Sequence, residues 1–183
     1  MTLTMLCHPD FPANNINSVE VTIAHNDDGI LILSYCVSGQ VSELVLLEQT
    51  KPKRTDYLWQ QTCFELFIGA AGQKSYLEFN LSPSTEWAIY AFEDHRRGMR
   101  NPALIVEPKI FCSQTESRYL LTAELDLGGM PCIDEGILEL AATAVIEEKN
   151  GQKSLWALAH PSGNPDFHNR DCFVHQLEGT ILQ

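Results

Sequence analysis

The sequence predicts an all-β fold, an antiparallel β-sandwich of about ten strands with jelly-roll or immunoglobulin-like layering. Short apolar runs, many of them alternating with polar residues, recur along the 183-residue chain and are separated by turn-forming residues. Helical periodicity is weak everywhere, and only the segment around Asp134 and residues 86–95 have room for a turn or two. Because this length suits one domain with its own core, we expect residues 1–183 to form a single domain.

Hairpin signals dominate the first half of the chain. Residues 26–29, Asn-Asp-Asp-Gly, separate two alternating runs and predict a tight turn between them. Residues 69–74 separate a second pair of runs in the same way. The strands predicted in this half are residues 19–25, 30–37, 44–47, 63–68, 76–81 and 87–92.

The second half continues the pattern. Residues 137–146 are almost wholly apolar, which is typical of a central strand buried on both faces. The following Asn150-Gly151 pair is the signature of a type I′ turn. The strands predicted in this half are residues 104–112, 118–126, 137–146, 154–159 and 172–177.

The charge balance excludes two classes of partner. The chain has 12 basic and 24 acidic residues, for a formal net charge of -12. A nucleic-acid-binding surface needs a basic footprint for the phosphates, and an anionic membrane surface also selects basic residues. We therefore expect neither nucleic acid nor a membrane as a partner, and oligomeric state stays open.

Cysteine usage predicts a reducing compartment. The chain has six cysteines, at positions 7, 36, 63, 112, 132 and 172, with no C-x-x-C pair and no zinc-type spacing. Most lie in apolar, strand-like runs, where a free cysteine behaves as a small apolar residue. The N-terminal residues lack the features of a secretory signal, so we expect a cytoplasmic protein with buried thiols.

The region from Trp59 to Phe92 predicts a ligand platform. Side chains alternate along a strand, so Tyr76, Glu78 and Asn80 share one face while the apolar residues between them face the core. Glu65 lies on the corresponding face of the preceding strand, and Trp59 and Trp87 flank the two strands. Rings for stacking beside amide and carboxylate groups suit a small polar ligand such as a sugar.

Two loops add further candidates. Arg96, Arg97 and Arg100 could bind carboxylates or vicinal hydroxyls of a ligand, or pair with nearby acidic residues. Residues 160–171 contain His160, Asp166, His168 and Asp171, whose spacing matches no specific metal template. A locally hydrogen-bonded loop is favoured there over a metal site, and such a loop also suits a ligand rim.

The same region resembles a known family. Leu58-Trp59, residues 63–68 (CFELFI), residues 76–83 (YLEFNLSP), residues 87–90 (WAIY) and residues 96–99 (RRGM) are similar to the DOMON-like β-sandwiches. Within this group, the chain resembles the branch that is similar to family 9 carbohydrate-binding modules. Near the C-terminus, residues 156–158 (WAL) and 165–168 (PDFH) resemble the closing segment of these domains.

The resemblance implies a sugar site. In the sugar-binding family two aromatic rings sandwich a terminal sugar, while carboxylate, amide and Arg groups bind its hydroxyls. Carried over, Trp59 is one ring, Glu65 the carboxylate, and Asn80 or Arg96 a further polar contact. The family's late Trp is replaced here by Phe167 and His168, and the acidic residue that usually begins the Glu65 strand by Thr62.

The resemblance also raises two cofactors. Relatives often hold structural calcium, but this chain shows no loop with the ligand pattern for it. Other DOMON domains bind haem through Met and His, for which Met99 and His168 are the candidates, although haem suits an exported redox context that the sequence does not show. We therefore expect no cofactor and no haem, while structural calcium stays open.

Together these features predict non-catalytic binding of a small polar ligand, most simply a carbohydrate. The expected site residues are Trp59, Glu65, Asn80, Trp87, Arg96, Phe167 and His168. Two alternatives remain open. A glycoside-processing enzyme would use Glu65 and Glu78 as its carboxylate pair, with one pKa raised. A protein-interaction scaffold would use the same platform without a small ligand.

Overall fold

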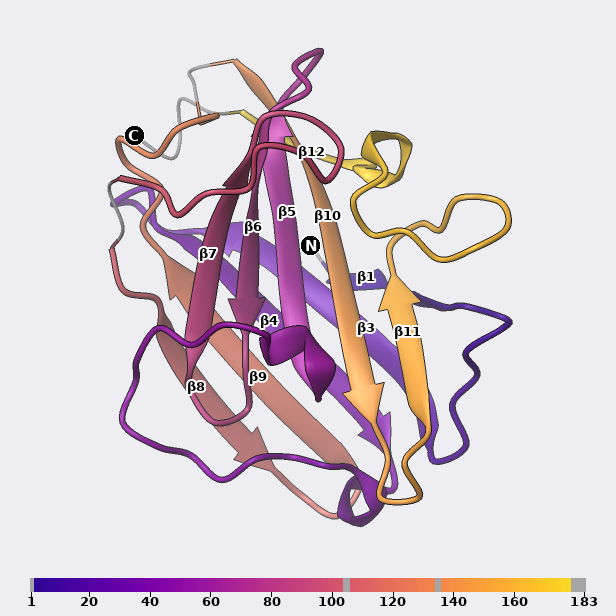
Figure 1. Cartoon of the computed structure of the whole chain (residues 1–183). Helices are drawn as coiled ribbons and strands as arrows, with labels where there is room; N and C mark the ends of the chain where they lie inside the picture. The colour runs from indigo at the N-terminus through magenta and orange to yellow at the C-terminus, as the bar shows by residue number, and fades with distance from the viewer. Residues whose placement is uncertain (1, 104–105, 134–135, 179–183) are drawn as a thin grey trace.

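The computed structural model of the chain describes residues 2–103, 106–133 and 136–178 and consists of two antiparallel β-sheets packed face to face (Figure 1). The five-stranded sheet is made of β1 (Thr2–Thr4), β3 (Ile16–His25), β4 (Leu31–Gly39), β9 (Arg118–Leu125) and β8 (Lys109–Gln114), in that spatial order. The seven-stranded sheet runs β2 (Leu6–Cys7), β11 (Lys153–Ala157), β10 (Ile137–Glu147), β5 (Cys63–Ala70), β6 (Tyr76–Leu81) and β7 (Trp87–Phe92), and β12 (His175–Glu178) also pairs with β10. The predicted all-β sandwich is confirmed.

Strand β10 organises the seven-stranded sheet. One of its edges pairs with β5, and its other edge pairs with β12 near the start of the strand and with β11 near its end. As predicted for a nearly continuous apolar run, β10 is a central strand that is buried along most of its length. This arrangement places β5 between β10 and β6, with Glu65 opposite Thr143 on one side and Asn80 on the other.

The main core lies between the two sheets. Phe64, Leu66 and Ile68 of β5 and Leu77, Phe79 and Leu81 of β6 face it, as the alternation of side chains predicts. Tyr35 of β4 is fully buried in this core, and its hydroxyl donates a 2.6 Å hydrogen bond to the backbone carbonyl of Glu65. The opposite sheet therefore holds the backbone of β5 directly behind the candidate site.

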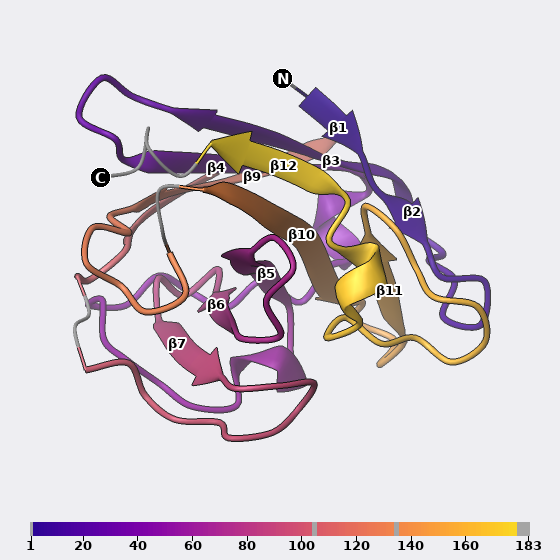
Figure 2. The ribbon, with the colours of Figure 1, turned by 90° about the horizontal axis from the view of Figure 1, so that it is seen from above.

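A second apolar cluster covers the outer face of the seven-stranded sheet. This outer aromatic cluster contains Phe67, Tyr76, Tyr90, Phe92 and Phe173, with Trp59 and Phe167 packed against it. The short 3₁₀ helix η2 (Leu58–Gln60) contacts β5 and β6 from this side and lies in front of them in Figure 1. The chain after β11 closes over the same sheet, as the view from above shows (Figure 2). Strands β5, β6 and β7 are consequently buried on both faces.

The structure corrects several predicted elements. Residues 44–47 form no strand but only an isolated bridge from Leu44 to Glu148. Strand β8 begins at Lys109 rather than at residue 104, and residues 104–105 and Asp134 lie outside the described residues. Residues 86–95 contain β7 and no helical turn, while β1 and β2 were not predicted because each is very short. At the C-terminal end, residues 170–172 form a 3₁₀ turn (η3) before β12 begins.

Two local predictions are also wrong. Gly151 has a positive φ of 86°, whereas Asn150 does not, and the Gly151 N–H donates to the Glu148 carbonyl. A type I′ turn needs a positive φ at both central residues, so this loop is instead a type I turn followed by a left-handed glycine. The thiols are not uniformly buried either, since only Cys63 and Cys172 are buried and the other four free cysteines are partly exposed.

Candidate functional site

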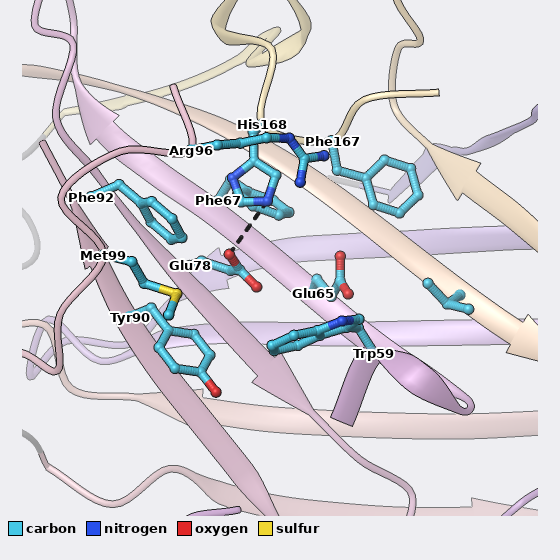
Figure 3. A pocket seen from close by; sticks show the side chains of 11 residues that line it. Trp59, Glu65, Phe67, Glu78, Tyr90, Phe92, Arg96, Met99, Phe167 and His168 are labelled. Carbon is cyan, nitrogen blue, oxygen red and sulfur yellow. Dashed lines mark ion pairs between the residues drawn. The ribbon is translucent and has the colours of Figure 1, made fainter. Parts of the chain in front are cut away.

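The candidate site is a cavity of about 410 Å³ over the outer face of the seven-stranded sheet. Its floor is formed by side chains of four strands: Glu65, Phe67, Glu78, Tyr90, Phe92 and Val145. Its walls come from η2 and from two loops, residues 93–100 and 160–170, and they consist of Trp59, Arg96, Met99, Phe167 and His168. Figure 3 shows the two carboxylates near the middle of this arrangement, with the rings around them.

Trp59 is placed by a sharp change in the backbone before η2. Tyr57 has a left-handed conformation, with φ of 65°, which turns the chain into the short helix. The Trp59 ring then contacts the ring of Tyr57 at 5.5 Å and the ring of Tyr90 at 5.9 Å, both edge to face. The Tyr90 hydroxyl in turn donates a 2.6 Å hydrogen bond to Asp56. Trp59 is therefore held from both sides and remains partly exposed at the cavity wall.

Glu65 and Glu78 are buried carboxylic acids, with exposed fractions of 3% and 6%. They are diagonal neighbours, because Glu65 lies opposite Asn80 and Glu78 lies opposite Phe67. Thr143 Oγ1 donates to Glu65 Oε2 at 2.8 Å, and Asn80 Nδ2 donates to Glu78 Oε1 at 2.7 Å. Burial raises the pKa of both side chains, and the charge of Glu78 raises the pKa of Glu65 further. The pair thus retains protons at a pH where exposed glutamates are ionised.

His168 enters the cavity as a neutral ring. Its Nδ1 lies 2.8 Å from the Tyr76 hydroxyl, and that oxygen also accepts a hydrogen bond from the backbone N–H of Arg96. In the tautomer in which the Tyr76 hydroxyl donates to Nδ1, the hydrogen of His168 lies on Nε2, which is 3.7 Å from Glu78 Oε2 (Figure 3). Burial, assisted by the nearby charge of Arg96, lowers the pKa of His168 to about 4.

Asp166 clamps together the two loops that form the upper wall. Its carboxylate accepts hydrogen bonds from Nε and Nη2 of Arg96 at 3.2 and 2.8 Å, and it pairs with His95 Nε2 at 2.7 Å. Arg96 has a φ of 53°, an uncommon conformation for a residue with a Cβ. The guanidinium group is thereby bound to Asp166 rather than to either buried glutamate.

The structure brings five of the seven predicted site residues to this cavity: Trp59, Glu65, Arg96, Phe167 and His168. Asn80 lies one layer below, fully buried, where it donates to Glu78 and accepts a hydrogen bond from the Cys63 thiol. It therefore positions a cavity residue instead of lining the cavity. Whether these residues bind a ligand stays a prediction.

Trp87 is placed elsewhere, and its assignment to the platform is corrected. It is the first residue of β7, where it pairs with Leu81 of β6 and therefore shares the core face of that residue. Its side chain is 6% exposed and packs in the main core between the sheets. The alternation of side chains along β7 contained this information, since Ala88, Tyr90 and Phe92 take the outer face.

The sequence reasoning missed Tyr90, Phe92, Phe67 and Met99 as cavity residues. For the two β7 rings the signal was their spacing of two, which puts both on the same face as Glu78. Met99 gave no such signal, because its position depends on the path of the loop after β7. Thr62, at the position of the family's acidic residue, is fully buried and accepts a hydrogen bond from the backbone N–H of Glu147.

The possible metal set in residues 160–171 is dispersed. His160 donates to the carbonyl of Leu6, while Asp166 is occupied by Arg96 and His95. Within the described residues, no three His, Cys, Asp or Glu side chains stand together in a metal-binding arrangement. The two candidate haem ligands, Met99 and His168, both line the cavity, but both ring nitrogens of His168 face protein groups.

A smaller cavity of about 300 Å³ adjoins the first and shares Trp59, Tyr90 and Met99 with it. Its other walls include Arg54, Arg100 and Asn101, and Arg54 is paired with Asp56 at 2.8 Å. The two cavities together could accommodate a ligand longer than a single ring. In the described part of the chain, no helix has the length and apolar character needed to cross a membrane.

Comparison with known proteins gives structural relatives only. No family model matches the sequence, and no curated protein matches it either. A candidate carbohydrate-binding protein from Bacteroides uniformis superposes with a TM-score of 0.60 at 15% identity, over 94% of this chain and 83% of that one. A family 9 carbohydrate-binding module from Caldicellulosiruptor kristjanssonii, solved in complex with cellotriose, superposes with a TM-score of 0.50 at 11% identity, over 93% and 74% of the two chains. The predicted resemblance is confirmed as a similarity of fold.

Proposed function

We propose that this chain binds a carbohydrate, without chemistry, in the cavity between Trp59 and the loops that Asp166 joins. The observation that carries the proposal is the composition of that cavity: aromatic rings, of which Trp59 and Phe167 are partly exposed, surround a small group of polar side chains whose hydrogen-bonding atoms are not all paired with one another. A sugar ring presents apolar C–H faces and hydroxyl edges, and it needs both kinds of contact. The similar fold of a module solved with cellotriose supports the same assignment.

The geometry suggests how a sugar would lie. Trp59 and Phe167 stand on either side of Glu65 in the view of Figure 3, so a ring between them would bring hydroxyls to the carboxyl groups. His168 Nε2–H and the free donor positions of Arg96 would reach other hydroxyls. The adjoining cavity behind Trp59 and Tyr90 would receive a second sugar unit.

Isothermal titration calorimetry with a panel of mono- and disaccharides tests this proposal. We expect saturable binding by the wild type and a loss of roughly ten-fold or more in affinity for Trp59→Ala, because ring stacking is removed. Phe111→Ala is the matched control, since Phe111 is an exposed ring on the five-stranded sheet. Absence of binding across the panel, or equal binding by the Trp59 variant, would contradict the proposal.

A glycoside-processing enzyme is the second candidate, because Glu65 and Glu78 line one cavity and both have a raised pKa. Such enzymes use one protonated and one ionised carboxyl group on either side of the bond that is cleaved. Assays with chromogenic glycosides separate the two functions. Turnover by the wild type that is lost in Glu78→Gln, with sugar binding retained, would establish the enzyme, whereas we expect no turnover.

A further inference from the structure

The two glutamates of the cavity are buried without a cationic partner. Each carboxyl group uses one oxygen for a protein contact, with Thr143 or with Asn80. Among the described residues, Glu65 Oε1 accepts no hydrogen bond, and Glu78 Oε2 faces only His168 Nε2, at 3.7 Å. Both side chains are more than nine-tenths buried and both line the cavity. Their free oxygens are therefore directed at the space a ligand would occupy.

The positive charge of Arg96 lowers the pKa of both glutamates, but burial outweighs it and both values stay raised. The Arg96 guanidinium is held by Asp166 through two hydrogen bonds, and it makes no ion pair with either glutamate. His168 is neutral, since its pKa is lowered to about 4. Ionised carboxylates that are buried without an ion-pair partner are costly, so the pair holds protons until a positive group from outside replaces them.

The aromatic walls favour the same kind of group. Trp59, Phe67, Tyr90 and Phe92 surround the carboxyl groups. The face of an aromatic ring attracts a cation, most strongly when water is excluded, and rings combined with carboxylates form cages for ammonium groups. A neutral sugar would use the rings for stacking and would leave the carboxyl pair protonated, without the attraction between opposite charges.

We propose that the ligand of this cavity carries a protonated amine, which binds between the carboxyl groups of Glu65 and Glu78 and against the surrounding rings. The inference rests on the proposed carbohydrate function and specifies it: the preferred ligand is an amino sugar with a free ammonium group. Neutral sugars of the same stereochemistry bind more weakly in the same cavity.

Proton release accompanies this binding. Without ligand, the pair holds protons because burial raises both pKa values and the charge of Glu78 raises that of Glu65 further. An ammonium group that pairs with the carboxylates releases protons from the pair to the buffer, whereas a neutral sugar does not. The titratable or charged groups that face the pair from other positions are Tyr35, Cys63, Tyr76, Tyr90, Arg96, Asp166 and His168. Burial raises the pKa of the tyrosines and of Cys63 and lowers that of His168. The tyrosines, Cys63 and His168 are therefore uncharged near pH 7, and the released protons come from the glutamate pair.

The test compares matched pairs of ligands: glucose with glucosamine, galactose with galactosamine, and mannose with mannosamine. Calorimetry at a pH of about 6.5, where the amines are largely protonated, is run in two buffers of different ionisation enthalpy, so that proton release is measured with affinity. We expect at least one amino sugar to bind roughly ten-fold or more tightly than its neutral partner and to release protons. N-acetylglucosamine, which has the same ring without the charge, should lose the advantage.

Variants locate the effect. Glu65→Gln and Glu78→Gln keep the size and one acceptor of each side chain, and each should remove the preference for the amino sugar. Glu20→Gln, on β3 of the other sheet, is the matched control and should preserve it. Equal affinity for the amino and neutral sugars, with Trp59→Ala weakening both, would overturn this inference and leave carbohydrate binding standing. Failure of every sugar to bind would overturn both proposals.

Discussion

The hydroxyl group of Tyr76 connects β6 to two loops. It contacts His168 Nδ1 and accepts the backbone N–H of Arg96, so a single oxygen fixes parts of both walls of the cavity. Tyr76→Phe leaves these two partners without the hydrogen bonds in a largely buried place, and we expect the free energy of unfolding to fall by about 1–3 kcal/mol. Urea denaturation measures the change.

Tyr57→Phe provides the comparison for that variant. Tyr57 is 63% exposed, so removal of its hydroxyl should alter stability by less than about 0.5 kcal/mol. Equal stability of the two variants would show that water replaces the hydrogen bonds of Tyr76 at no cost in free energy.

Glu65 makes stability depend on pH in a defined direction. Its pKa in the folded protein is raised above that of the unfolded chain, mainly by burial and then by Glu78. The stability associated with its proton is complete below the ordinary carboxyl pKa, about 4, and is lost as pH rises from there through the raised value. Glu65→Gln should therefore gain stability relative to the wild type as pH increases, by about 1 kcal/mol or more at alkaline pH.

Thermal unfolding followed from acid to alkaline pH tests this expectation. Glu20→Gln should run parallel to the wild type, because Glu20 lies at the partly exposed surface of β3. A constant difference between Glu65→Gln and the wild type across the pH range would show that Glu65 has an ordinary pKa.

At the scale of elements, the loops 93–100 and 160–170 act as one wall only while Asp166 joins them. Asp166→Asn removes the charge that holds Arg96 and His95, and the affinity for sugar should fall several-fold. Global stability should change by no more than about 1 kcal/mol, because Arg96 and His95 are more than half exposed and Asp166 is partly exposed. Calorimetric affinity and melting temperature, measured on the same samples, separate the two effects.

Asp171→Asn is the control within the same segment. Asp171 lies in η3, and we expect its substitution to leave affinity unchanged. Should Asp166→Asn bind sugar as the wild type does, the wall would be held by its apolar contacts instead.

At the scale of the molecule, the core between the sheets determines stability. Phe64 is fully buried on β5 and contacts the rings of Tyr35 and Tyr119 of the opposite sheet at 5.1 and 6.0 Å. Phe64→Ala removes this contact between the layers and should cost about 3–5 kcal/mol of unfolding free energy. Phe111→Ala, at an exposed ring, should cost about 0.5 kcal/mol or less. Denaturant titration of both variants measures the two changes in unfolding free energy. A large loss for Phe64→Ala alone shows that the two sheets are stabilised by their shared core.

The sequence could predict the layers of this fold because the faces of a strand follow from a period of two. Thus the core face of β6 and the outward position of Glu65 and Glu78 were both predictable. The same alternation also places Trp87 on the core face, whereas its assignment to the platform rested on its residue type alone. What remained unpredictable depends on contacts between distant segments: Asp166 with Arg96, Tyr76 with His168, and Met99 beside Tyr90. No local pattern encodes these pairings.

The late position of the closing segment has a consequence for synthesis of the chain. Strands β5, β6 and β7 leave the ribosome many residues before residues 160–173, which cover their outer face. Until that segment emerges, Phe67, Tyr76 and Phe92 are exposed on a nascent sheet, which also lacks β10 until residues 137–147 have been made. A growing polypeptide of this kind is vulnerable to aggregation, so chains that stop short of residue 160 should depend on chaperones more than complete ones do.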